Sequence, residues 1–205
     1  MSSRPEAVGE AERVELELDS SFWERVFTVA PLVLVGTREP DGGYDLAPKH
    51  LASPLWGPFF QFVCTPKHAT YRNAVREGAF TVSWPRHDQV VLTSLASSPR
   101  CEGGDKPELQ GLPTFAARQV DGVLLRDGYF FLECRTDRVV DEIGENSLVI
   151  GRVVAALADR AALRASERED DELLRANPLL AYLHPGRFAT IEKSQGFPFP
   201  RGFRR

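Results

Sequence analysis

The stretch FFQFVCTPKHATYRNAVREG, residues 59–78, decides the fold prediction because it joins a strand to a helix through a short cationic turn. Residues 59–64 are almost continuously apolar, which is typical of a strand covered on both faces. A Thr-Pro step then ends the strand. Thr70 is a natural N-cap for a helix that ends at Gly78.

The turn between these two elements has the residue types of an anion site. Lys67, His68 and Arg72 surround the hydroxyl of Thr70. A helix start exposes unpaired backbone N–H groups and a partial positive charge, so added cations make it a candidate phosphate site. The phosphate could belong to a substrate, a nucleotide or a flavin. The alternative is an ordinary strand–helix junction with solvated charges.

Composition favours an ordinary soluble globular protein. The 205 residues are 42% hydrophobic and 26% charged, which suits one domain with appendages. A formal net charge of −4 argues against a nucleic-acid partner, and the short basic tail of Arg201, Arg204 and Arg205 does not change this. No apolar run approaches the roughly 20 residues that span a bilayer, so no membrane association is expected. The first residues lack a signal-peptide core, which predicts a cytoplasmic location.

Cysteine and histidine usage gives no sign of metal chemistry. Cys64 and Cys134 lie in apolar runs, where cysteine usually behaves as a small hydrophobic residue. Cys101 lies in a polar loop without an adjacent catalytic partner, and the odd count of three does not indicate a disulfide framework. The four histidines are scattered without zinc-ligand spacing.

The first half of the chain predicts several short strands. Residues 31–37 form a compact apolar run, and a turn at 41–43 joins it to a strand over 44–47 as a hairpin. Residues 46–58, LAPKHLASPLWGP, are rich in Pro and Gly and indicate a shaped loop. Residues 80–84 are a further strand, and residues 90–94 fit either a strand or the first turn of a helix.

The second half begins with a polar loop over 97–113, a length that is often functional or mobile. A turn at Asp127-Gly128 predicts that residues 123–125 pair with a strand over 129–135. The turn at 144–146 leads into a strand over 148–154.

A second helix is predicted to begin near Ser166, which has capping-box spacing to Glu169, and to stop at Asn177-Pro178. A last strand covers 188–191, before a Phe/Pro/Gly tail that is no regular element. We therefore divide the chain into a flexible N-terminal arm over 1–20, one domain over 21–195 and a C-terminal tail over 196–205.

The order of elements predicts a mainly β fold. Six or more strands with two helices do not alternate as a doubly wound sheet would. Neither a GxGxxG sequence after a strand nor a Walker P-loop is present. A closed antiparallel β-barrel with helical additions at its ends is the economical arrangement.

The chain resembles the flavin reductase-like proteins with an FMN-binding split barrel, which include the flavoredoxin-type proteins. The resemblance runs from about Ala30 to Ile191. Its segments, in order, are PLVLVGT, DLAPKHLASP, FFQFVC, TPKHATYRN, GAFTVSWP, LECRTDRVVDEIGENSLVIGRVVAA and LLAYLHPGRFATIE. The resemblance implies an antiparallel Greek-key split barrel.

The resemblance also implies where FMN binds, with FAD less expected. The loop of Leu46, Ala47, Pro48 and Lys49 would lie beside the isoalloxazine ring and ribityl chain, largely through backbone groups. The turn from Thr65 to Thr70 would bind the phosphate.

In that turn, Thr70 would donate its hydroxyl, and Lys67, His68 and Arg72 would supply charge. Asn73, one helical turn further on, is expected to tie the helix start to a neighbouring loop.

Several other residues have two readings. Lys49 either stabilises negative charge on the N1–C2=O edge of reduced flavin or is a solvated loop lysine. Ser53 either contacts the ribityl chain or caps a loop, and Trp56 is expected to pack rather than to stack on flavin.

The segment leading into the long loop also offers candidates. Ser94 and Ala96 are expected to face the flavin from the same or a partner subunit, and Lys106 and Glu108 to help cover the site.

The chain departs from the family at two points. Pro48-Lys49 replaces a small hydroxyl residue that several flavin reductases have. Gly144-Glu145-Asn146-Ser147 replaces a Gly-Asp-His sequence whose histidine lies near the nicotinamide. Glu145 or Asn146 serves a different substrate or simply forms the turn.

The sequence is compatible with three functions. The first is an FMN-dependent oxidoreductase that takes hydride from NAD(P)H as co-substrate and passes electrons to a small-molecule or protein acceptor. The second is a flavoredoxin-like FMN-binding electron carrier or flavin-storage protein without its own NAD(P)H site. The third is an interaction protein that has lost flavin, against which the Lys67/His68/Thr70 turn argues. The family further implies a homodimer with flavin near the subunit interface.

Overall fold

The computed structural model describes residues 13–19, 22–102, 104, 106–166 and 169–202. The strands are β1 (Thr28–Pro31), β2 (Val33–Arg38), β3 (Tyr44–Lys49), β4 (Ala52–Leu55), β5 (Phe59–Cys64), β6 (Ala79–Trp84), β7 (Thr114–Ala116), β8 (Val123–Leu125), β9 (Phe130–Ile143), β10 (Asn146–Ala158), β11 (Leu179–His184) and β12 (Arg187–Ile191). The helices are α1 (Ala69–Glu77), α2 (Val90–Leu95) and α3 (Asp170–Ala176), with 3-10 turns η1 (Phe22–Glu24), η2 (His87–Gln89), η3 (Pro107–Gly111) and η4 (Arg160–Ala162). The chain is therefore mainly β, as predicted.

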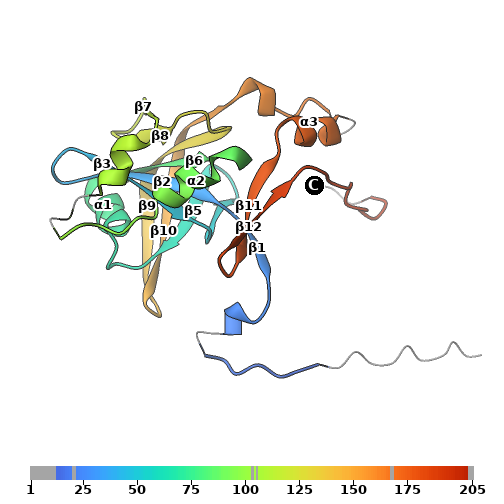
Figure 1. Ribbon diagram of the computed structural model, residues 1–205, viewed down its shortest axis with the longest axis horizontal. Helices are drawn as coiled ribbons and strands as arrows, with labels where there is room; N and C mark the ends of the chain where they lie inside the picture. The colour runs from blue at the N-terminus through green and yellow to red at the C-terminus, as the bar shows by residue number, and fades with distance from the viewer. Residues whose placement is uncertain (1–12, 20–21, 103, 105, 167–168, 203–205) are drawn as a thin grey trace, which may run out of the picture.

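One antiparallel sheet of seven strands forms the body of the molecule, in the order β3-β2-β6-β9-β10-β5-β4 (Figure 1). Its two edge strands, β3 and β4, follow one another in the chain through His50 and Leu51. The sheet therefore curls so that its edges come back toward one corner. Among the described residues β3 and β4 form no ladder, so the expected barrel is open at this seam.

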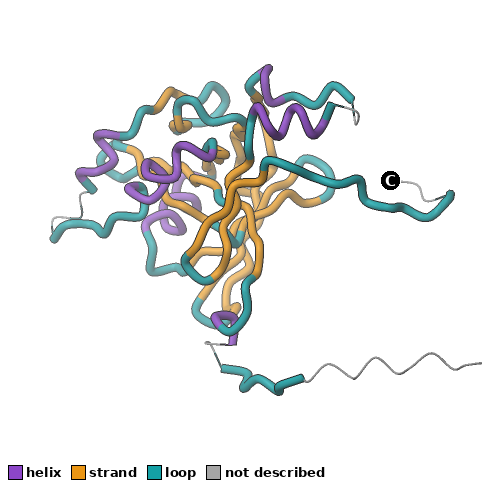
Figure 2. The backbone as a smooth tube through the Cα atoms, turned by 45° about the vertical axis from the view of Figure 1, so that its right-hand side comes forward, coloured by secondary structure: helices purple, strands orange, loops and turns teal. Residues whose placement is uncertain are grey.

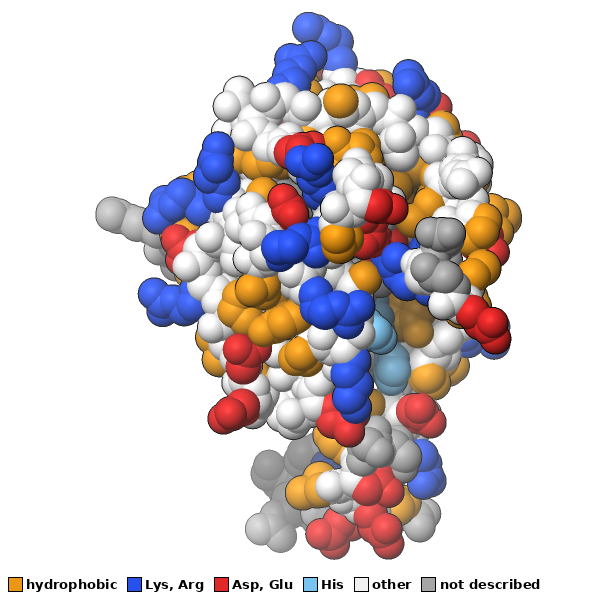
Figure 3. All heavy atoms as spheres, turned by 90° about the vertical axis from the view of Figure 1, so that its left-hand side faces the viewer, with side chains coloured by type: hydrophobic (Ala, Val, Ile, Leu, Met, Phe, Trp, Pro, Cys, Tyr) orange, Lys and Arg blue, Asp and Glu red, His pale blue; other side chains and the backbone are white. Residues whose placement is uncertain are grey.

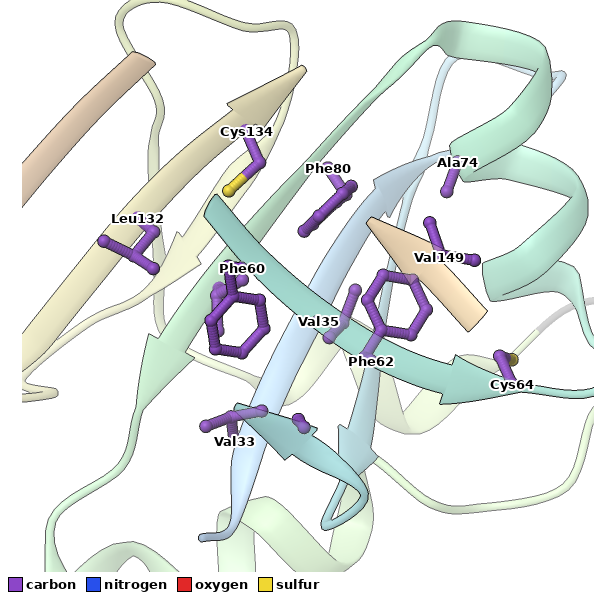
Figure 4. Close-up of a cluster of buried hydrophobic side chains, with 12 residues drawn as sticks. Val33, Val35, Phe60, Phe62, Cys64, Ala74, Phe80, Leu132, Cys134 and Val149 are labelled. Atoms are coloured by element: carbon purple, nitrogen blue, oxygen red, sulfur yellow. The ribbon is translucent and has the colours of Figure 1, made fainter. Parts of the chain in front are cut away.

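Two apolar clusters fill the two sides of the sheet near β2. The larger gathers side chains from β2, β5, β6, β9, β10 and α1, with the rings of Phe60, Phe62 and Phe80 at its centre (Figure 4). The smaller contains Leu34 and Leu125 and lies under α2, η3 and β8. Strand β2 is therefore buried on both faces, as is its neighbour β6. Strand β5 instead alternates between buried and half-buried residues, so the prediction of two covered faces over 59–64 was wrong.

Glycine allows the close approach of β8 to β2. A Cβ atom built on Gly36 would lie 2.7 Å from the backbone oxygen of Val123 and 2.3 Å from Thr81 Oγ1. Any side chain at this position would push the two strands apart. The fold therefore requires glycine in the middle of an otherwise apolar strand.

One prediction about strand pairing and one about a loop were wrong. Strand β8 pairs with β7 rather than with β9, because the Asp127 turn carries the chain away to a different sheet position beside β6. The segment 46–58 is not a loop throughout, since β3 continues to Lys49 and β4 covers Ala52–Leu55. Pro48 and Pro54 are tolerated there because β3 and β4 are edge strands.

The predicted helices form with shifted starts. Helix α1 has His68, not Thr70, at its N-cap, and it ends at Gly78 in the left-handed conformation with φ 61°. Helix α3 begins at Asp170, four residues after Ser166, and ends at Asn177 as expected. The capping box at Ser166 is wrong because Glu169 occupies the N-cap without a side-chain hydrogen bond. Residues 90–95 are the helix α2 rather than a strand.

A second sheet, in the order β1-β11-β12, lies beside the main sheet and leads into the C-terminal segment (Figures 1 and 2). The predicted arm over 1–20 lies largely outside the described residues, and its described part, 13–19, contains no helix or strand. The same is true of residues 196–202 in the predicted tail. Among the described residues, no helix is both long and apolar enough to cross a membrane.

The cysteines have the environments that the sequence predicts. Cys64 and Cys134 are buried, Cys101 is exposed, and all three are free thiols. Burial raises the pKa of the Cys134 thiol to about 12, with a smaller contribution from Glu133. Cys134 is therefore a packing residue and not a nucleophile. The described residues contain no group of three or more His, Cys, Asp or Glu side chains arranged to hold a metal ion.

Candidate functional site

A cavity of about 400 Å³ lies where the second half of β3 meets the start of α1 and the segment that follows α2. Figure 3 shows the corresponding face, where blue Lys and Arg side chains gather around a hollow that contains pale-blue histidine. The lining residues are Asp45, Ala47, Pro48, Lys49, Lys67, His68, Ala69, Thr70, Arg72, Ala96, Ser97, Ser98, Pro99, Arg100 and Lys106.

The cavity brings together eight of the residues selected from the sequence, which are Ala47, Pro48, Lys49, Lys67, His68, Thr70, Arg72 and Ala96. Four others lie elsewhere. Leu46 and Ser94 line two neighbouring cavities. Ser53 accepts a hydrogen bond from Gln61 on β5 at 3.0 Å, and Thr65 accepts one from the backbone N–H of Lys67 at 3.4 Å.

The start of α1 supplies backbone donors to this cavity. His68 is the N-cap in extended conformation and makes no side-chain cap. The first backbone hydrogen bond of the helix runs from the N–H of Arg72 to the oxygen of His68, at 3.3 Å. The N–H groups of the first turn are thus left for a ligand, together with the positive end of the helix dipole.

Basic side chains surround that helix start. The lining includes Lys49, Lys67 and Arg72, of which Lys67 is highly exposed and makes a loose pair with Glu145 at 3.8 Å. The pKa of His68 is lowered from 6.5, first by burial and then by the charges of Lys49 and Arg72. The two cations beside His68, together with Lys67, make this end of the cavity positive, which favours an anionic ligand.

A buried carboxylate forms the floor of the cavity. Asp45 on β3 is 3% exposed and accepts from Lys106 Nζ at 3.2 Å and from Arg100 at 3.3 Å. Thr70 Oγ1 donates to the same carboxylate at 3.5 Å, a long hydrogen bond. Asp45 therefore joins β3, α1 and the loop over 97–113 at one point.

Lys106 is a fully engaged buried cation. Besides Asp45, its ammonium group donates to the backbone oxygens of Leu46 and Ala96, so all three N–H bonds have acceptors. Arg100 similarly bonds Glu39 and the backbone oxygen of Gly104. Lys106 was predicted to help cover the site. In the structure its ammonium group fastens the loop over 97–113 to β3. Glu108 is exposed and does not line the cavity.

Sequence reasoning missed Asp45 and Arg100. Asp45 is the second residue of the hairpin strand β3 and is followed by the buried Leu46 and Ala47, and a carboxylate buried there requires a cationic partner. That requirement was a usable signal, but the partners lie 55 and 61 residues away in the sequence. Only the tertiary structure identifies them.

Two further expectations are corrected. Asn73 does tie α1 down, but to Thr37 on strand β2 at 3.2 Å rather than to a loop. Trp56, expected to pack, is 97% exposed in the turn between β4 and β5.

The comparisons with known proteins identify the family. The model of the flavin reductase like domain matches residues 27–191, which is most of the chain. The protein therefore belongs to the flavin reductase-like family. None of the curated proteins compared with the chain matches it.

Solved structures share the fold at low sequence identity. The flavoredoxin of Methanosarcina acetivorans is 19% identical, with a TM-score of 0.73 over 94% of this chain and 98% of that one. A putative flavin reductase with split barrel domain from Shewanella frigidimarina is 17% identical, with a TM-score of 0.71 over 84% and 87%. An FMN-binding protein from Thermus thermophilus, solved with p-hydroxybenzaldehyde, is 19% identical, with a TM-score of 0.70 over 92% and 99%. These likenesses establish the split-barrel fold.

The donor set of the cavity fits the phosphate end of a flavin nucleotide. A phosphate dianion requires several N–H donors and excess positive charge, and the helix start with Lys67 and Arg72 provides both. The neighbouring wall of β3 is backbone and small apolar side chains at Ala47 and Pro48, which leaves room for a flat ring. The carboxylate of Asp45 does not oppose the anion because two cations neutralise it.

Proposed function

We propose that this protein is an FMN-binding oxidoreductase that accepts hydride from NAD(P)H and passes electrons to a small-molecule or protein acceptor. The observation that carries the proposal is the cationic cavity at the start of α1, walled by β3. Membership of the flavin reductase-like family and the FMN-binding neighbours support the choice of cofactor. When bound, the flavin supplies hydride acceptance and single-electron transfer, which no side chain provides.

The residues of the cavity have separate tasks in this proposal. Lys67, His68 and the N–H groups at the start of α1 hold the phosphate. Lys49, half-buried on β3, places a positive charge beside the cavity and favours the anionic reduced ring. Asp45, Arg100 and Lys106 keep the loop over 97–113 against the site and exclude water from one side of it.

One observation favours a second candidate, a flavoredoxin-like electron carrier without its own NAD(P)H site. Glu145 lies in the turn between β9 and β10 and Asn146 is the first residue of β10, so neither position carries an imidazole. Glu145 pairs instead with Lys67 across the edge of the cavity at 3.8 Å. In this alternative, electrons enter from another protein.

We further propose that the protein forms a homodimer with flavin near the interface. Apolar side chains of the β1-β11-β12 sheet and the segment before it are exposed, with Phe27 at 68%, Val29 at 70% and Phe188 at 53%. A second copy would bury this surface. Light scattering coupled to size-exclusion chromatography measures the mass directly, and a monomer at micromolar concentration would refute the dimer.

The cofactor proposal is tested by the visible spectrum and by FMN titration. We expect the purified protein to bind FMN and the combined Lys67→Ala, His68→Ala and Thr70→Ala variant to bind it about 100-fold more weakly, because Lys67 and His68 no longer bond the phosphate and the hydroxyl that joins α1 to Asp45 is lost. The matched control is Arg138→Ala, an exposed strand arginine on β9. Circular dichroism of the triple variant checks the fold, and unchanged FMN affinity would move the site elsewhere.

Steady-state oxidation of NADH and NADPH separates the two candidates. With FMN-loaded protein and free flavin as acceptor, the oxidoreductase proposal expects turnover well above that of free FMN in buffer. A rate equal to the buffer rate, with FMN still bound, would select the electron carrier.

A further inference from the structure

A second cavity of about 330 Å³ adjoins the cationic cavity. It lies between the end of β3, the helix α2 and the turn that joins β11 to β12. Its lining residues are Leu32, Pro48, His50, Val90, Thr93, Ser94, Ser97, Tyr182, Gly186, Arg187 and Phe188. Pro48 and Ser97 line both cavities, so the two spaces share a wall.

Aromatic rings form one side of this second cavity. The ring of His50 lies 4.5 Å from that of Tyr182 and is stacked on that of His184, with centroids 5.7 Å apart. Phe188, which is also part of the proposed dimer surface, lines the same cavity. Rings at these separations offer a flat surface on which another ring can stack.

Polar groups at the cavity remain available for a ligand. The hydroxyl oxygen of Tyr182 accepts from the backbone N–H of Gly186 at 2.9 Å, which leaves its proton free to be donated. Within the described part of the chain, neither ring nitrogen of His50 takes part in a hydrogen bond. These groups can bond an oxygen of a ligand without losing a partner in the protein.

The charge of the cavity comes from Arg187 alone among the described lining residues. No carboxylate lines it, and the described residues contain no ion pair to this guanidinium. His50 adds little positive charge near neutral pH. Its pKa is lowered from 6.5, first by burial and then by His184 and Lys49. An arginine without a carboxylate partner beside aromatic rings has the chemistry that recognises a planar anion.

We propose that this second cavity binds a single-ring aromatic carboxylate. The ring would stack against His50 and Tyr182, and the carboxylate would accept from Arg187. The volume is at the lower end for ligand sites, which suits a single ring. Because Pro48 and Ser97 line both cavities, the ligand would lie beside the flavin. This position relative to the flavin rests on the proposed function, whereas binding of the carboxylate itself does not.

Isothermal titration calorimetry with benzoate tests the proposal. We expect saturable binding to the wild-type protein, weaker binding of benzamide because the charge is lost, and weaker binding of cyclohexanecarboxylate because the flat ring is lost. Arg187→Gln should weaken benzoate binding about tenfold, which is the value of a charged hydrogen bond. His50→Leu should weaken benzoate more than cyclohexanecarboxylate. The control Arg138→Gln, on the exposed end of β9, should leave both unchanged.

The outcomes are separable. No heat of binding at millimolar benzoate, or equal affinity in Arg187→Gln and wild type, would overturn the proposal. Repeating the titration with FMN present distinguishes the two sites. Benzoate that binds together with FMN supports a separate cavity, whereas strict competition places it in the cationic cavity and refutes the proposal. Benzoate binding in a protein that fails to bind FMN would support this inference and reject only the cofactor proposal.

Discussion

Two buried carboxylates fasten two neighbouring loops, and they do so in different ways. Asp45 holds the loop over 97–113 through the side chains of Arg100 and Lys106. Glu133 on β9 is fully buried and holds residues 118–120 through their backbone N–H groups, two of them from Arg118 and Val120 at 2.9 and 3.2 Å. Both satisfy a buried charge, but of the two only Asp45 lines the cationic cavity.

The kind of donor that satisfies each carboxylate indicates whether it serves only the fold or also the ligand site. Glu133 uses backbone donors, which any residue except proline supplies, so its loop can vary in sequence. Asp45 needs two particular cations and also contacts Thr70 of α1. A network that depends on side-chain identity and borders a cationic cavity is expected to affect ligand binding as well as stability.

The largest effect is expected from Lys106→Met. This change leaves Asp45 buried with one cation fewer, and removal of one partner from a buried pair costs about 3 kcal/mol of unfolding free energy. FMN affinity should also fall, because the loop over 97–113 loses its anchor. Urea unfolding and FMN titration measure the two effects. The double variant Asp45→Asn, Lys106→Met should recover part of the stability, and a double variant less stable than Lys106→Met would contradict the pairing.

A smaller loss, about 2 kcal/mol, is expected from Glu133→Gln, because the amide satisfies fewer of the N–H groups that converge on the carboxylate. FMN affinity should stay within twofold of wild type, since this loop does not line the cavity. The same urea and titration experiments apply. A large loss of FMN affinity here would remove the distinction between the two carboxylates.

Lys49→Gln should weaken FMN binding about threefold to tenfold with little change in stability, because Lys49 lines the cavity but makes no ion pair in the described structure. The reduction potential of bound FMN should also become more negative, since a positive charge near the ring is removed. Potentiometric titration decides between the two readings of Lys49. An unchanged potential would make it a solvated lysine.

The smallest expected effect is the uptake of protons by His68 when FMN binds. In the protein without FMN, the pKa of His68 lies below 6.5, so its ring is mostly neutral at pH 6.5 and above. A bound phosphate favours the imidazolium and raises this pKa, so FMN binding should take up a fraction of a proton in the pH range between the two pKa values of His68. Calorimetry in two buffers with different ionisation enthalpies measures the uptake. His68→Gln should take up less than wild type, and equal uptake would show that His68 does not face the phosphate.

Much of the fold was predictable because its signals are local. The hairpin at 41–43, the helix end at Gly78 and the strands near 80 and 150 follow from turn residues and apolar runs. The pairing of β8 was not predictable in this way. The turn at Asp127 looks like a hairpin turn, yet β9 prefers the longer ladders with β6 and β10.

The candidate site also has one part that could be recognised from the sequence and one part that could not. Lys67, His68 and Arg72 stand close together in the sequence, so a cationic helix start could be recognised from residues 65–72 alone. The N-cap was misplaced by two residues because the hydroxyl of Thr70 turns to Asp45 instead of capping the helix. A distant carboxylate thus overrode a local preference.

The sequence by itself determined a mainly β chain with a cationic strand–helix turn, since periodicity, turn chemistry and charge are properties of neighbouring residues. The tertiary structure alone decided which loops close over that turn. Asp45 and Lys106 are 61 residues apart, and His50 and Tyr182 come from opposite ends of the domain. Contacts of this kind depend on how the sheet curls and where its edges meet, and no local pattern encodes them.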